Sequence, residues 1–73
     1  MQNSEEQMWN LTGLERRCLS ALIEGKTEFE LQEEVQLSGF TVQIIINALL
    51  KKLNVRNVAG LIFKVLDNEV ALQ

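Results

Sequence analysis

Apolar residues recur along most of the chain at intervals of three and four, the period of an amphipathic helix. Residues 14–23 carry six apolar side chains at spacings of one to four, which predicts one broad buried face. Leu31 and Val35, four apart, predict a shorter helix with a narrower apolar face. No segment alternates with the period of a strand, and there is no proline. The pattern predicts an all-α chain of four helices joined by short turns.

Two capping-box signatures mark where the first two helices begin. Thr12 lies three residues before Glu15, and Thr27 lies three residues before Glu30. In each pair the threonine and the glutamate can satisfy each other's free backbone N–H groups. Gly25, between the two signatures, predicts the end of the first helix.

The third helix is predicted over about residues 39–53, after a tight turn at residues 37–39. Ser38 is its expected N-cap, and Asn54 its expected left-handed end. Asn57 is expected to cap a fourth helix that continues to about residue 66. The positions expected to face the core are Val42, Ile46, Leu49, Leu53, Leu61, Ile62 and Val65, with Ile45 and Leu50 beside them.

The opposite side of the third helix should face outward. At about 100° per residue, that side carries Phe40, Gln43, Ile44, Asn47 and Lys51. Phe40 and Ile44 predict a protein-binding surface, contacts with thymine methyl groups, or a patch covered by a rotated helix or a folded tail. Gln43 and Asn47 are suited to hydrogen bonds with adenine edges, or they form an ordinary solvated surface.

Length and composition restrict how the fold is stabilised. A chain of 73 residues is one small domain, and 47% of it is hydrophobic. One cysteine and no histidine provide neither a disulfide nor a zinc ligand set. Its stability must therefore come from tight helix packing, or from a partner that shares the core.

The distribution of charge is unusual for a nucleic-acid-binding protein. The net charge is −3 and the pI about 4.8, whereas DNA-binding domains are usually basic. Residues 27–50 contain four glutamates and no lysine or arginine, a net charge of −4. Residues 51–73 have a net charge of +2, because four basic residues outnumber two acidic ones. These four basic residues are Lys51, Lys52, Arg56 and Lys64. Either they compensate the negative charge at helix C-termini, or they contact phosphate.

The chain lacks the residues of common catalytic and cofactor sites. There is no histidine, no glycine-rich phosphate loop, and no base for the lone Cys18, which is expected to be a buried hydrophobic side chain. We therefore expect no enzyme activity and no cofactor, metal or small-molecule ligand. The polar first ten residues and short apolar runs predict neither a signal peptide nor a membrane span, and the single cysteine favours a cytoplasmic protein.

A set of positions follows a known motif in register, without a gap, across residues 11–73. These positions are Leu11, Thr12, Glu15, Leu19, Gly25, Thr27, Glu30, Leu31, Leu37, Ser38, Thr41, Val42, Leu49, Lys52, Leu53 and Val55. The pattern resembles the LuxR/GerE-type helix-turn-helix domain, the output module of many bacterial response regulators and quorum-sensing receptors. The resemblance implies a four-helix helix-turn-helix domain over residues 11–73, preceded by a flexible arm at residues 1–10.

The chain departs from this family at positions that contact DNA or pack beside them. Gln43 replaces a lysine or arginine, and Ile45 replaces a histidine. Phe29 stands where lysine is common, Gln32 where a small alanine packs, and Val58 where an arginine opens the last helix. Most of the phosphate contacts that the resemblance implies are therefore missing.

What remains of the family's functional positions leads to two hypotheses. Thr41, Lys52 and Arg56 are candidates for residual phosphate contacts, and the family's dimer helix corresponds to residues 57–66, with Leu61, Ile62 and Val65. The first hypothesis is a transcription-regulator-like protein that acts by homo- or heterodimerisation and modulates a regulator, with direct DNA binding weakened or lost. The alternative is a conventional sequence-specific, dimeric DNA-binding regulator.

Overall fold

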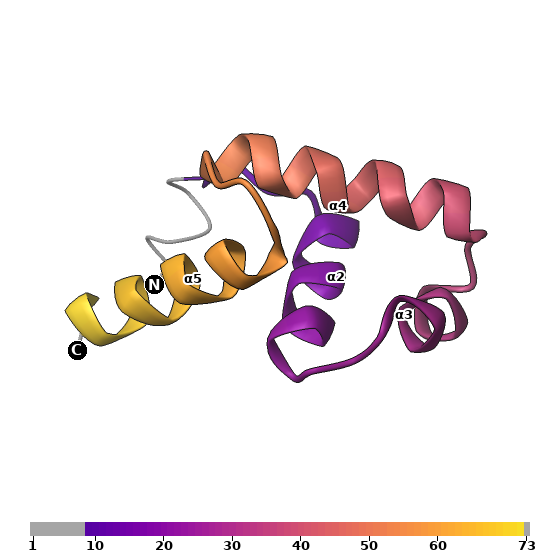
Figure 1. Cartoon of the computed structure of the whole chain (residues 1–73), viewed down its shortest axis with the longest axis horizontal. Helices are drawn as coiled ribbons and strands as arrows, with labels where there is room; N and C mark the ends of the chain where they lie inside the picture. The colour runs from indigo at the N-terminus through magenta and orange to yellow at the C-terminus, as the bar shows by residue number, and fades with distance from the viewer. Residues whose placement is uncertain (1–8, 73) are drawn as a thin grey trace.

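The computed structural model describes residues 9–72, and side chains as far as Asn68. Within this range the elements are four helices and no strand: α2 Gly13–Ile23, α3 Glu28–Val35, α4 Gly39–Leu53 and α5 Val58–Leu72. Helix α2 lies in the middle and contacts the other three. In Figure 1, α4 runs across the top of α2, and α5 and α3 lie on opposite sides of it. The predicted all-α, four-helix class is confirmed.

Both predicted capping boxes are present. Thr12 Oγ1 accepts from the Glu15 N–H at 3.1 Å, and Glu15 Oε1 accepts from the Thr12 N–H at 2.9 Å. Thr27 and Glu30 repeat the arrangement at the start of α3. These reciprocal bonds satisfy N–H groups that a helix leaves without partners in its first turn.

Residues with positive φ follow three of the described helices, and Gly25, with φ 91°, is the one after α2, where the sequence predicted the end of that helix. Asn54 ends α4 with φ 59°, and its N–H donates to carbonyls of the preceding turn, as its sequence position predicted. Gln36 ends α3 with φ 59°. Sequence reasoning missed Gln36, because glutamine carries no preference for this conformation comparable to that of glycine or asparagine.

Helix α5 is longer than the sequence analysis predicted. Asn57 does cap it, since its Oδ1 accepts from the Gly60 N–H at 2.8 Å. The predicted end near Leu66 is wrong, because the helix continues to Leu72. No glycine or proline follows Leu66 to stop it, and residues 67–72 can propagate the helix.

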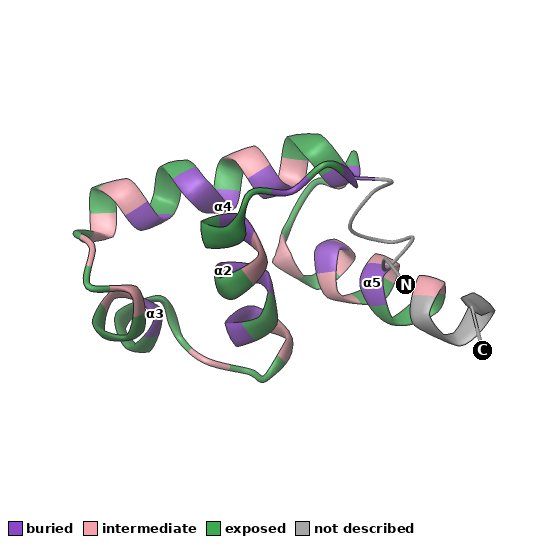
Figure 2. Ribbon diagram, turned by 180° about the vertical axis from the view of Figure 1, so that it is seen from behind, coloured by how far each residue is buried: buried purple, intermediate pink, exposed green. Residues whose placement is uncertain are grey.

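The core lies where α2, α4 and α5 meet and extends to α3. Val42, Ile46, Leu49 and Leu53 form the buried stripe of α4 predicted from their spacing, and Ile45 is buried beside them. Figure 2 shows the buried positions on the inner sides of the helices. The remaining buried hydrophobic residues are Trp9, Leu11, Cys18, Leu19, Ala21, Leu22, Leu31, Leu61 and Val65.

Only the end of the predicted N-terminal arm is described. Residues 1–8 lie outside the described range, and Asn10 is exposed. Trp9 is buried in the core, next to the domain boundary that the sequence placed at residue 11. Across the described part of the chain, no helix combines the length and the apolar character that crossing a membrane requires.

Candidate functional site

Helices α3 and α4 form the helix-turn-helix unit. The Leu37 N–H donates to the Gln32 carbonyl at 3.2 Å, and Ser38 then caps α4 by accepting from the Thr41 N–H at 3.2 Å. The Gln32 amide packs against Gly39, where an added Cβ would lie 2.9 Å from Gln32 Nε2. The larger glutamine on α3 thus lies against a glycine at the start of α4.

The outward face of α4 consists of Phe40, Gln43, Ile44, Asn47 and Lys51, all of which are exposed. Phe40 is 77% exposed and Ile44 is 52% exposed, so neither a rotation of α4 nor the described part of the chain covers them. Gln43 Nε2 donates to Asn47 Oδ1 at 3.2 Å, one turn further along the helix. This face therefore presents two apolar side chains next to a pair of linked amides.

Thr41, a candidate for phosphate contact, takes part in the cap of α4. Its Oγ1 lies 3.0 Å from Ser38 Oγ, and the side chain is half-buried. The hydroxyl is therefore already in a local hydrogen bond at the beginning of the helix. A phosphate contact at Thr41 stays a prediction.

Lys52, the second candidate, pairs with a carboxylate of the same chain. Its Nζ lies 2.8 Å from Glu15 Oε1 and 3.2 Å from the Asn10 carbonyl oxygen. Burial favours a higher pKa for Glu15, but hydrogen bonds and charge from Lys52, with the Thr12 hydrogen bonds, outweigh it and lower that pKa. The Lys52 charge thus compensates a buried carboxylate rather than standing alone on the surface.

The remaining basic residues of the segment differ in their surroundings. Lys64 Nζ donates to the Leu53 carbonyl at 2.8 Å, so it compensates the C-terminus of α4, one of the two roles proposed for it. Lys51 and Arg56 are exposed, and within the described chain neither forms a hydrogen bond or an ion pair. Near the C-terminal end of α4, Lys51 and Arg56 are therefore the cations that are available to a partner.

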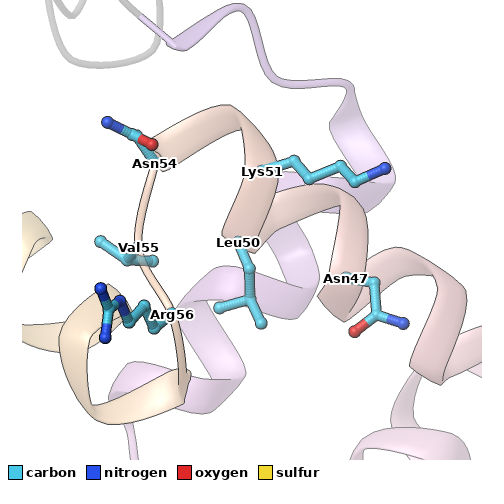
Figure 3. A pocket seen from close by; sticks show the side chains of 6 residues that line it. All are labelled: Asn47, Leu50, Lys51, Asn54, Val55 and Arg56. Atoms are coloured by element: carbon cyan, nitrogen blue, oxygen red, sulfur yellow. The ribbon is translucent and has the colours of Figure 1, made fainter.

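Lys51 and Arg56 flank a depression that sequence reasoning missed. Its volume is about 500 Å³, and Figure 3 shows Leu50 between Asn47 and Arg56. The depression joins the end of α4 to the residues after it, so no single helical pattern reveals it. Its lining residues are Asn47, Leu50, Lys51, Asn54, Val55 and Arg56.

Helix α3 carries the carboxylates of the helix-turn-helix unit. All four of its glutamates are exposed, in agreement with a solvated surface. Glu34 is paired with Lys26, and its carbonyl accepts from Arg17 Nη2 at 3.3 Å, so this glutamate is engaged towards α2. Glu28 and Glu33 form no ion pair with another described residue. Phe29, between them in sequence, is 66% exposed.

The residues named for the dimer helix lie mostly inside the domain. Leu61 and Val65 are buried in the core, and Ile62 is half-buried. The exposed apolar residues of α5 are instead Phe63 and Leu66, which sequence reasoning did not single out. A dimer through α5 stays a prediction, but its contact residues would include Phe63 and Leu66 rather than Leu61 or Val65.

Comparison with known proteins identifies the family. The family model described as bacterial regulatory proteins, luxR family, matches residues 9–65, which begins at the buried Trp9 and includes the whole helix-turn-helix unit. Comparison with curated proteins and comparison with solved structures gave no significant match. The matched region covers most of the chain and includes α2, α3, α4 and the first half of α5. The chain therefore belongs to the luxR family of bacterial regulatory proteins.

Proposed function

We propose that this chain is a transcription-regulator-like protein that acts by protein association and modulates a regulator, with direct DNA binding weakened or lost. The observation that carries this proposal is the outward face of α4, where Phe40 and Ile44 are exposed without a basic residue in the first half of the helix. In the family's helix-turn-helix domain, this is the helix that reads the major groove.

Charge is the first argument against strong DNA binding. Phosphate neutralisation supplies most non-specific affinity for DNA. Residues 27–50 have a net charge of −4, and Glu28 and Glu33 are exposed on α3 without an ion-pair partner among the described residues. Carboxylates beside the groove would repel the phosphates that a recognition helix must approach.

The positions of the basic residues are the second argument. Lys52 and Lys64 are engaged with Glu15 and with the end of α4. Lys51 and Arg56 are exposed and have no ion-pair partner among the described residues; Lys51 lies in the last turn of α4 and Arg56 lies three residues after its end. Two cations at one end of the helix cannot fix its register along the groove, which backbone contacts normally provide.

Exposed apolar surface is the argument for protein association. An apolar cluster surrounded by polar groups is typical of a protein interface, because its burial releases water. Phe40 and Ile44 lie one turn apart and are flanked by Gln43 and Asn47. An aromatic centre with adjacent amides resembles the central part of many protein interfaces.

A DNA titration tests the proposal. Fluorescence anisotropy of a labelled random-sequence duplex at low salt should show no binding in the range typical of non-specific binders, a dissociation constant of about 1–100 µM. Binding at sub-micromolar protein, with a steep dependence on salt, would support the conventional DNA-binding regulator instead.

A pair of variants tests the role of the α4 face. Ile44→Lys places a charge in the apolar patch and should abolish protein association measured by sedimentation. Phe63→Lys adds the same charge on α5, at a side chain that is also exposed, and should leave association through α4 unchanged. Equal effects of the two substitutions would show that net charge, rather than the α4 face, controls association.

A further inference from the structure

One side of α4 contacts α3 at the N-terminal end of the helix and borders the depression at the C-terminal end. Gly39, Gln43, Leu50 and Asn54 are separated by four, seven and four residues, so they lie along the same side of the helix. At Gly39 this side contacts α3 through Gln32. At Leu50 and Asn54 it borders the depression (Figure 3).

The two ends of this side of α4 carry opposite charges. At the α3 end, Phe29 and Glu33 are exposed and lie four residues apart, on one side of α3. At the other end, the depression has Leu50 and Val55 in its lining, beside Lys51 and Arg56. An aromatic ring and a carboxylate thus lie at one end, and a depression of mixed polarity with two cations at the other.

We propose that the protein bound at the α4 face is a second copy of this chain, turned antiparallel about a two-fold axis, with α3 of each copy in the depression of the other. This inference rests on the proposed function, because it requires the α4 face to bind protein. A two-fold interface needs a single patch that is complementary to itself. In an antiparallel pair, the N-terminal end of each α4 lies beside the C-terminal end of the other. The α3 of each copy therefore meets the depression of the other copy, and both contacts form together.

The same interface would also remove the exposed apolar residues of α4 from water. Ile44 lies near the middle of α4, so in an antiparallel pair it approaches the axis from both copies. Phe40, the second residue of α4, lies opposite the C-terminal end of the other copy's α4. A strongly basic partner would match Glu28 and Glu33 but would place positive charge against Lys51 and Arg56. A second copy satisfies both groups of charges, which favours it over such a partner.

The size of the surface sets the strength of the expected dimer. Stable interfaces bury about 800 Å² on each partner, and the whole accessible surface of this chain is 5019 Å². One face of α4 with the eight-residue α3 is at the small end of that range. The dimer should therefore form in the micromolar range. It would cover the groove-facing side of both copies.

Sedimentation velocity of the 73-residue chain over a concentration series tests this arrangement. Lys51→Glu and Glu33→Lys should each weaken dimerisation about tenfold or more by placing like charges together. The two substitutions in one chain should restore much of the loss, because they exchange the charges of the pair. Phe63→Ala, which would weaken a dimer formed through α5 instead, should leave the α4 dimer unchanged. Circular dichroism should confirm that every variant is folded.

The outcomes separate this inference from the proposed function. A chain that stays monomeric, or a dimer that is lost in Phe63→Ala and not in Lys51→Glu or Glu33→Lys, overturns the antiparallel α4 dimer. If that chain also fails to bind the random-sequence duplex, the proposed loss of DNA binding stands. Salt-dependent DNA binding at sub-micromolar protein overturns the proposed function itself.

Discussion

Lys52 Nζ lies 2.8 Å from Glu15 Oε1, although the two residues are 37 positions apart in the chain. This ion pair connects the C-terminal half of α4 to the capping box at the beginning of α2. Glu15 is buried and also accepts from the Thr12 N–H at 2.9 Å. One carboxylate thus completes a helix cap and pairs with a cation that the sequence analysis named as a candidate for phosphate contact.

Replacing Glu15 with glutamine should destabilise the fold. Glu15→Gln keeps the shape and can still accept from the Thr12 N–H, but it loses the charge that pairs with Lys52. We expect a loss of about 1–2 kcal/mol in the free energy of unfolding, measured by urea denaturation. Glu30→Gln is the matched control, because Glu30 closes the other capping box at an exposed position. A larger loss for Glu30→Gln would contradict the importance of the ion pair.

The same carboxylate should make stability depend on pH at the acidic end. The pKa of Glu15 is lower in the folded chain than its ordinary value, so the folded state favours the charged form. This contribution is complete above the unfolded pKa of about 4.3 and is lost as pH falls through the lower folded pKa. Thermal unfolding between about pH 6 and pH 3 should show the melting temperature falling, with a shallower fall in Glu15→Gln.

Truncating the centre of the α4 stripe should largely unfold the chain. Leu49 is fully buried, and Leu49→Ala should cost about 2–5 kcal/mol. Domains of this length are stable by only about 4–10 kcal/mol, so circular dichroism should report a large loss of helix on mild heating. Ile44→Ala, on the exposed side of the same helix, should change stability little. A similar loss in both variants would mean that Ile44 is also buried in solution.

The elements that the sequence predicted depend on local interactions. Capping by Thr12, Thr27 and Ser38 involves partners three residues away, so the signal lies in one short segment. The stripe from Val42 to Leu53 follows from the helical period alone. The exposure of Phe40 and Ile44 follows from the same period, because they lie opposite that stripe.

The features that the sequence did not predict depend on distant contacts or on weak local preferences. The Lys52–Glu15 pair requires α2 and α4 to lie side by side, which no pattern within either helix specifies. The depression joins α4 to the residues after Asn54, and its shape depends on the left-handed turn there. Phe63 was overlooked because the resemblance directed attention to Leu61 and Val65, which the fold buries.

Restoring a cation to the outward face of α4 should increase the affinity for DNA, if missing phosphate contacts are the reason that DNA binding is weak. Gln43→Lys returns the charge that the family has at this position, and one added phosphate contact should steepen the slope of log K against log salt by about 0.9. Anisotropy with the random-sequence duplex at several salt concentrations measures that slope. Phe63→Lys is the control, because it changes net charge equally on α5. A change in Gln43→Lys alone would place the groove contact on α4, whereas equal changes would reflect net charge only.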